Sequence, residues 1–206
     1  ADGLLKRLDD PAWTDDLYVL AAVAQSPRAT TDILDRIARK DDPRLHQKLL
    51  GTKAALGKNQ KGLAVMRLVA RHPNVSQDTL GRLARSPDEY VISDVLANSK
   101  TPEAVLRDFG DRDSYLIDWG IAQNPKAPPE LLHKRSSSKN EYTRSFVARN
   151  PNTPVVLLSS LARDASWIVR RDVTLHPGVP RALLEQLAQD SDQRVRLSAE
   201  RELKKR

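Results

Sequence analysis

Prolines recur every 26 residues along most of this chain. Pro73, Pro125, Pro151 and Pro177 share one register, with Ser99 in the remaining place, and five leucines keep the same spacing: Leu80, Leu106, Leu132, Leu158 and Leu184. A period of about 20 to 50 residues indicates a unit that is one supersecondary element, too small to bury its apolar face alone. Neighbouring units must therefore stack, and the sequence predicts a repeat array.

Each unit contains two apolar stripes with helical spacing. In one copy the first stripe is Leu157, Leu158 and Leu161, and the second pairs Val169 with Val173. Residues three and four apart share one face of an α-helix, so each unit is predicted to hold two helices, the second one short and either α or 3-10. The predicted fold is all-α: a two-layered, curved α-solenoid of about six to seven two-helix repeats.

Polar residues and prolines mark the ends of the predicted helices. One column ahead of each second helix holds residue types that accept hydrogen bonds from helix N–H groups, namely Asp88, Ser114, Asn140, Ser166 and Asp192. Asparagine follows the second helix at positions 98, 124 and 150, where its tolerance of the left-handed conformation is expected to end the helix. His72 and His176 occupy the same column and are expected to cap a helix there.

The register predicts one helical-repeat domain over residues 1–206. Five regular repeats cover residues 69–198. Residues 1–25 are predicted to form a capping half-repeat, and residues 26–68 an irregular repeat with a basic insertion near 51–62, where glycines and lysines indicate a solvated loop. The charged residues 199–206 are expected to cap the other end of the array.

The segment Val147–Pro154 reads VARNPNTP. It resembles the signature of the leucine-rich variant repeat family, and the resemblance covers about residues 20–200. It implies a right-handed stack of short helices. Some family members bind an iron–sulfur centre through a cysteine cluster, but this chain contains no cysteine, so that function does not transfer. Residues Asp192–Arg196 also match the D-x-x-V-R pattern of HEAT-like helices, and this resemblance implies a ladder of Asp–Arg pairs between units that involves Arg144, Arg170 and Arg196.

Composition excludes several classes of chemistry. The absence of cysteine rules out disulfides, thiolate metal ligands and thiol nucleophiles. The four histidines are scattered, and no paired-histidine motif, phosphate-binding glycine loop or nucleophile elbow is present. We therefore expect no catalytic residues, no metal and no cofactor. No apolar run reaches the roughly 18 residues of a membrane span, and a cytoplasmic location is expected, while the oligomeric state is left open.

Positive charge is concentrated in two zones of this chain, whose formal net charge is +7. Residues 43–71 contain seven Lys and Arg and no acidic residue, which predicts attraction to anions. A helical wheel also places Arg and aromatic side chains on the exposed arc of the second helices, a combination that binds phosphates and unstacked bases. The predicted binding residues are Arg71, Tyr90, Trp119, Gln123, Tyr142, Arg149, Arg171, Arg194, Arg201, Lys53, Lys58 and Lys61.

The sequence therefore predicts a non-enzymatic binding scaffold with an extended basic and aromatic surface, for which two partner classes compete, and the first candidate is the nucleic-acid phosphate backbone. The alternative is a protein scaffold that binds a peptide or an acidic partner. A plain solvated face, whose rings cover gaps between units, would give the same pattern. A remote alternative is a HEAT-like alkylpurine DNA glycosylase, in which Asp118, Trp119 and Trp167, with Arg149 or Arg171, would form the site.

Overall fold

The structure of the protein is a computed structural model that describes residues 16–40, 42–47 and 64–205. These residues form thirteen α-helices and one 3-10 helix, and no strand occurs among them, which confirms the predicted all-α class. The sequence predicts one domain, whereas the structure groups the chain into two compact units, Ala1–Pro102 and Glu103–Arg206. Each unit is a stack of two-helix repeats.

The first unit is built around one buried helix, α6, which packs against α3, α4, α7, α8 and η2. Its core includes Leu34, Val69 and Leu80, all fully buried. The predicted basic insertion, residues 51–62, lies outside the described residues. The elements of this unit are α3 (Leu17–Gln25), α4 (Thr31–Ala38), η2 (Pro43–His46), α6 (Val65–Arg71), α7 (Gln77–Leu83) and α8 (Glu89–Ala97).

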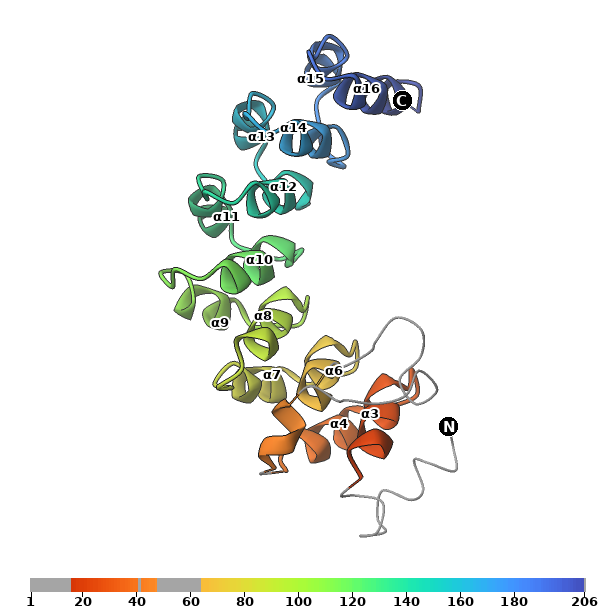
Figure 1. Ribbon diagram of the computed structural model, residues 1–206, viewed down its shortest axis with the longest axis vertical. Helices are drawn as coiled ribbons and strands as arrows, with labels where there is room; N and C mark the ends of the chain where they lie inside the picture. Colours follow the sequence, from red (N-terminus) through yellow and green to blue (C-terminus); the bar gives the residue numbers. More distant parts are fainter. Residues whose placement is uncertain (1–15, 41, 48–63, 206) are drawn as a thin grey trace. The chain divides into compact units, whose positions relative to one another are not determined.

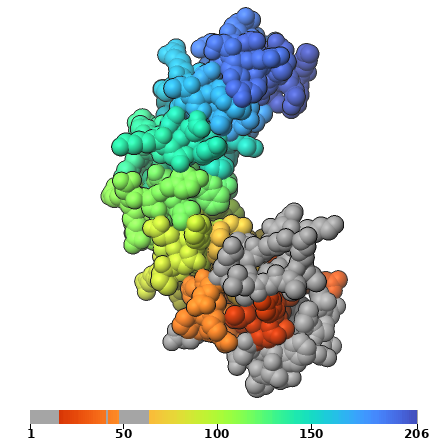
Figure 2. Space-filling model, in the orientation of Figure 1, coloured from red at the N-terminus to blue at the C-terminus, as the bar shows by residue number. Residues whose placement is uncertain are grey.

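The second unit holds the most regular repeats. Its first helices are α9 (Glu103–Asp108), α11 (Pro129–Arg135), α13 (Val155–Leu161) and α15 (Arg181–Leu187), and its second helices are α10 (Tyr115–Gln123), α12 (Glu141–Arg149), α14 (Trp167–Thr174) and α16 (Gln193–Leu203). The second helices pack side by side in one layer, and the first helices form the other layer (Figure 1). Each repeat therefore contributes its own band of surface (Figure 2).

The second helices are longer than the first helices in these repeats. α10 and α12 span nine residues each and are α-helical, whereas the first helices α11 and α13 span seven. Of the two forms that the sequence predicts for the short second helix, the structure has the α-helix. The physical reason for the difference in length is that a polar N-cap starts each second helix and nothing stops it before the asparagine column, while a proline fixes the start of each first helix.

The predicted core columns are buried. Leu80, Leu106, Leu132, Leu158 and Leu184 have no exposed surface, and the same holds for Val95, Ile121, Val147 and Val173. Side chains of the first helix and of the second helix thus meet between the two layers, as the 26-residue register predicts. Burying a leucine in this way stabilises the fold by roughly 1.5–3 kcal/mol relative to leaving it exposed.

Four of the five predicted caps make the expected hydrogen bond. The side chains of Asp88, Asn140, Ser166 and Asp192 accept from the backbone N–H two residues onward. Ser114 is also the N-cap residue of its helix, but no side-chain capping bond forms there. The column therefore marks where each second helix begins, and in most repeats it also satisfies a helix N–H that would otherwise lack a partner.

The asparagine column ties successive repeats together, which the sequence does not predict. Asn98 and Asn150 have extended φ and ψ, so the expected left-handed conformation is wrong. Their side-chain amides instead donate to backbone carbonyls of the preceding repeat, Asn98 to Ala70 and Asn150 to Ala122. His176 makes the equivalent contact through Nε2 to Asn150 O, and its Nδ1 accepts from the Gly178 N–H. Both residue types offer a donor and an acceptor at the right separation.

A ladder of ion pairs joins the later repeats. Arg144 donates to Asp164, and Arg170 donates to Asp190, with Nε–Oδ2 distances of 2.6 and 2.8 Å. The same arginines also donate to backbone carbonyls at the start of their own helix, as Arg196 does. The predicted ladder is confirmed for Arg144 and Arg170, whose acid lies two residues before the N-cap of the next second helix. Arg196 donates to the carbonyl oxygens of Asp190 and Ser191 and forms no ion pair with a described residue.

We expect this ladder to make the fold sensitive to acid. The hydrogen bond from Arg170 lowers the pKa of Asp190 below its usual 3.8. Burial raises the pKa of Asp164, but hydrogen bonds from Arg144 and from the Ser166 N–H outweigh burial, so the pKa of Asp164 is lowered as well. Carboxyls with lowered folded pKa add stability that is fully present above the unfolded pKa, about 3.8, and is lost as the pH falls through the folded value. Urea unfolding at pH 3 and pH 6 should differ less in the double variant Asp164→Asn, Asp190→Asn than in the parent. An unchanged pH dependence would contradict this assignment.

Candidate binding surface

Twelve side chains line the exposed side of the second helices in the unit of residues 103–206. We call this set the second-helix face: Leu116, Trp119, Gln123, Tyr142, Phe146, Arg149, Ile168, Arg171, Leu175, Arg194, Leu197 and Arg201. All are half-buried or exposed, and none is acidic. They come from α10, α12, α14 and α16, whose packing brings equivalent positions of successive repeats side by side.

Apolar side chains are unusually exposed on this face. Tyr142 is 52% exposed, Leu175 41% and Leu197 52%. Single exposed hydrophobic residues are ordinary on protein surfaces, but several on neighbouring helices indicate a site for another molecule. Phe146 and Ile168 lie between them and are half-buried.

The arginines of the second-helix face fall into two classes. Arg171 and Arg194 form ion pairs with Asp172 and Asp192, at 2.7 and 2.6 Å. Asp172 is buried and also accepts a hydrogen bond from Ser145. Arg149 and Arg201, both exposed, make no ion pair with any residue that the structure describes. The face therefore carries two uncompensated positive charges, fewer than its four arginines suggest.

The aromatic rings are partly occupied. The Trp119 and Phe146 rings pack edge to face, with centroids 5.9 Å apart. Trp167 lies beside this face, and the Arg194 guanidinium stacks over its ring at 3.4 Å, with Arg171 at 5.3 Å. Cation–π contacts of this kind stabilise the arginine positions. These rings consequently offer less free area for base stacking than the sequence suggests, and Tyr142 is the most exposed ring of the face.

The predicted site residues of the first unit are arranged differently. Arg71 and Arg67 both bind the buried carboxylate of Asp94, at 2.7 and 2.6 Å. Tyr90 is exposed, and Arg67 lies over its ring at 5.0 Å. Arg71 is thus part of a structural ion-pair cluster, although its side chain and that of Tyr90 both remain exposed.

The described arginines of the acid-free segment 43–71 pair with acids that lie outside it. Arg44 pairs with Asp42, and the counter-acid of Arg67 and Arg71 comes from α8. For these three arginines the expectation of no nearby acid is wrong, because the neutralising residues lie just before the segment and one repeat after it. The predicted Lys53, Lys58 and Lys61 lie outside the described residues.

In the glycosylase alternative, Asp118 and both tryptophans have partners within the fold, whereas Arg149 forms no ion pair with a described residue. Asp118 pairs with Arg135, whose Nε lies 3.2 Å from Oδ1, while Trp119 contacts Phe146 and Trp167 contacts Arg171 and Arg194. Burial raises the pKa of Asp118 against the attraction of Arg135, and burial lowers the pKa of Arg135. Both shifts disfavour the charged forms of the two groups.

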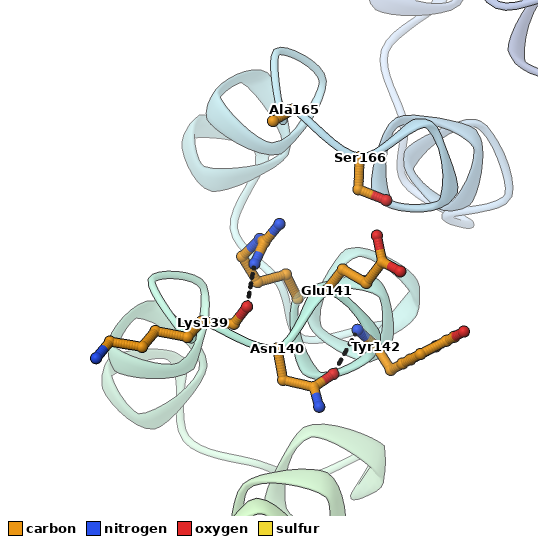
Figure 3. A pocket seen from close by; sticks show the side chains of 7 residues that line it. Lys139, Asn140, Glu141, Tyr142, Ala165 and Ser166 are labelled. Atoms are coloured by element: carbon orange, nitrogen blue, oxygen red, sulfur yellow. Dashed lines mark hydrogen bonds between the residues drawn. The ribbon is translucent and has the colours of Figure 1, made fainter.

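A shallow cavity of about 560 Å³ lies between the start of α12 and the turn before α14. Figure 3 shows that Lys139 and Tyr142 extend away from each other, and that Asn140 caps Tyr142 within its own helix. The Arg144 guanidinium is held by Asp164 and by Ser138 O. The polar groups that line the cavity do not converge on a common point, so the cavity does not indicate a particular ligand.

Metal and membrane functions find no support in the described part of the chain. Within it, no three His, Cys, Asp or Glu side chains come together in a way that could hold a metal ion. No helix in these ranges has the length and hydropathy needed to cross a membrane.

The sequence predicts seven of the twelve face residues as site residues and misses Phe146 and the four aliphatic ones. Leu197 stands in the same 26-residue column as Trp119 and Arg171, and Leu175 stands in the column of Arg149 and Arg201. The signal was therefore present, because a leucine in an exposed column is as informative as an arginine.

No family model and no curated protein matches the chain. Among solved structures, it is similar to a leucine-rich repeat variant with a novel repetitive structural motif, at 20% identity and a TM-score of 0.43, over 97% of this chain and 80% of that one. It is also similar to an engineered protein at 14% identity and a TM-score of 0.44, over 98% of this chain and 67% of that one. These similarities say nothing about binding or activity.

Proposed function

We propose that the protein is a non-enzymatic scaffold that binds a segment of another protein on the second-helix face. The observation that supports this most directly is the exposure of Tyr142, Leu175 and Leu197 beside two unpaired arginines. Protein interfaces combine apolar anchors with a polar rim, and arginine and tyrosine are enriched in them. A chain of stacked repeats presents such a face as a continuous strip along its helices.

Nucleic acid, the first candidate from the sequence, fits this face less well. Binding to a phosphate backbone depends on neutralised phosphates, and each contributes about −0.7 to −0.9 to the slope of log affinity against log salt. Arg171 and Arg194 are already paired with carboxylates. Arg149 and Arg201 alone would give a slope of only about −1.4 to −1.8, which corresponds to weak nonspecific binding.

Two measurements test the proposed function. In the first, fluorescence anisotropy with single-stranded and duplex oligonucleotides is recorded at several salt concentrations. We expect weak binding with a shallow slope, because few cations are free. A slope steeper than about −4, flattened by Arg149→Glu and Arg201→Glu, would indicate nucleic acid instead.

In the second measurement, a displayed library of random peptides is selected on the protein, and the selected peptides are tested on variants. We expect to select peptides whose binding is lost in the double variant Leu175→Asp, Leu197→Asp. The reason is that a bound peptide would bury the new carboxylates without a partner, which costs free energy. The matched control is Val156→Asp, at a position of α13 that is 77% exposed but belongs to a first helix. Peptides that bind both variants equally would contradict the proposed function.

A further inference from the structure

One row of the second-helix face alternates charge and apolar surface in a regular way. Arg149, Leu175 and Arg201 occupy the same position in three successive repeats, each 26 residues after the last. They lie on α12, just after α14 and on α16, and these helices pack in that order. Two unpaired arginines thus bracket an exposed leucine, with Leu197 exposed on the neighbouring row.

The spacing of this row matches one type of extended chain. Packed helices lie about 8–10 Å apart, so equivalent positions on neighbouring helices repeat at about that distance. A polyproline-II segment advances about 3.1 Å per residue with three residues per turn, so its side chains i, i+3 and i+6 share one face about 9.3 Å apart. A strand returns to the same face every second residue, about 6.7 Å, and does not match.

The charge of the row selects the partner. Arg149 ends α12, and Leu175 is the C-cap residue of α14. The carboxyl ends of helices carry partial negative charge and repel acidic groups unless cations lie there. An acidic ligand would therefore depend on Arg149 and Arg201, while an apolar side chain between its acidic groups would cover Leu175 and Leu197.

We propose, on the basis of the proposed function, that Arg149, Leu175 and Arg201 bind an extended segment of a partner protein with the pattern acidic-x-x-apolar-x-x-acidic in polyproline-II conformation. Its two carboxylates pair with the arginines, and its central side chain packs on the leucines. The segment crosses α12, α14 and α16 nearly at right angles to their axes. The preformed polyproline-II geometry limits the conformational entropy that binding removes.

The probe for this proposal is a fluorescent proline-rich peptide with Glu, Leu and Glu at i, i+3 and i+6. Its control has the same composition with these residues at i, i+2 and i+4. We expect the first peptide to bind roughly tenfold more tightly, because only its three side chains reach the row together. Equal affinity of the two peptides would overturn the proposed register.

Charge reversal provides the second arm. Arg149→Glu with Arg201→Glu should weaken the Glu-Leu-Glu peptide by roughly tenfold or more, and should let a Lys-Leu-Lys peptide of the same spacing bind instead. Arg163→Glu is the matched control, because Arg163 is exposed but lies in the turn after α13. Circular dichroism verifies that each variant keeps its helix content. Unchanged affinity in the double variant, or no rescue by the lysine peptide, would overturn the proposal.

The two proposals fail in different ways. Selected peptides that need Leu175 and Leu197 but lack the acidic pattern would overturn this inference and leave the proposed function standing. Selected peptides whose affinity is unchanged by substitution of Leu175 and Leu197 would overturn the proposed function itself.

Discussion

Leu158→Ala should lower the free energy of unfolding by about 2–5 kcal/mol, as truncation of a buried leucine generally does. Leu158 has no exposed surface and lies in the leucine column of the core. The loss combines the transfer free energy of the removed methyl groups with the cavity that neighbouring side chains cannot fill. The measurement is urea unfolding followed by circular dichroism, with the slope of the transition compared between variant and parent.

Val156→Ala on the same helix is the control for that experiment. Its side chain is 77% exposed, so its truncation should change the stability by less than about 0.5 kcal/mol. A similar loss in both variants would mean that helix α13 itself, and not the buried column, determines the result.

Replacing the ion pair of Asp118 and Arg135 should stabilise the protein. Arg135 is 2% exposed and stands in a core column that elsewhere contains Leu83, Leu161 and Leu187. Its hydrogen bonds to the carbonyl oxygens of Leu131 and Phe109 are long, both 3.4 Å. Although its Nε lies 3.2 Å from Asp118, the geometry is not that of a hydrogen bond, and the Nε makes none with the described residues. Buried pairs with incomplete hydrogen bonding are often less favourable than hydrophobic packing.

The other repeats supply the replacement. One period later, the places of Asp118 and of Ser138 are taken by Arg144 and Asp164, the ladder pair. The triple variant Asp118→Arg, Arg135→Leu, Ser138→Asp should therefore gain about 1–4 kcal/mol. Asp118→Asn alone should destabilise, because it leaves the buried guanidinium without a counter-charge. Loss of stability in the triple variant, measured by the same urea unfolding, would show that Arg135 is needed in this repeat for packing.

Periodicity made the fold predictable. A period of 26 residues assigns every position to a column, and apolar columns such as that of Leu158 must be buried whatever the details of the helices. The cap column was predictable for the same reason, because Asp, Asn and Ser recur where a helix must begin. The lengths of the helices were not, since they depend on where a helix is stopped and not only on where apolar residues fall.

The charges of the candidate surface were predictable only in part. The sequence shows Arg67 and Arg71 in a segment without acids, but their partner Asp94 lies 27 and 23 residues further on. Counting charges along a segment cannot detect a partner that belongs to the next repeat. The columns carry more information, because Arg135 among leucines and Leu175 between the exposed Arg149 and Arg201 both depart from their columns.

The ladder has a consequence for the length of the chain. Arg144 reaches Asp164 and Arg170 reaches Asp190, each twenty residues onward. If residues 147–172 were deleted, Asp190 would stand twenty residues after Arg144. Arg144 could then pair with Asp190, and every core position would keep its place in the 26-residue register. A deletion that begins between Arg144 and Asp164 and whose length is not a whole number of periods would separate Arg144 from the acid of its ladder pair. A whole repeat can therefore be deleted or duplicated without a compensating substitution. Such a change would shorten or lengthen the face and so alter the length of the segment that the protein can bind.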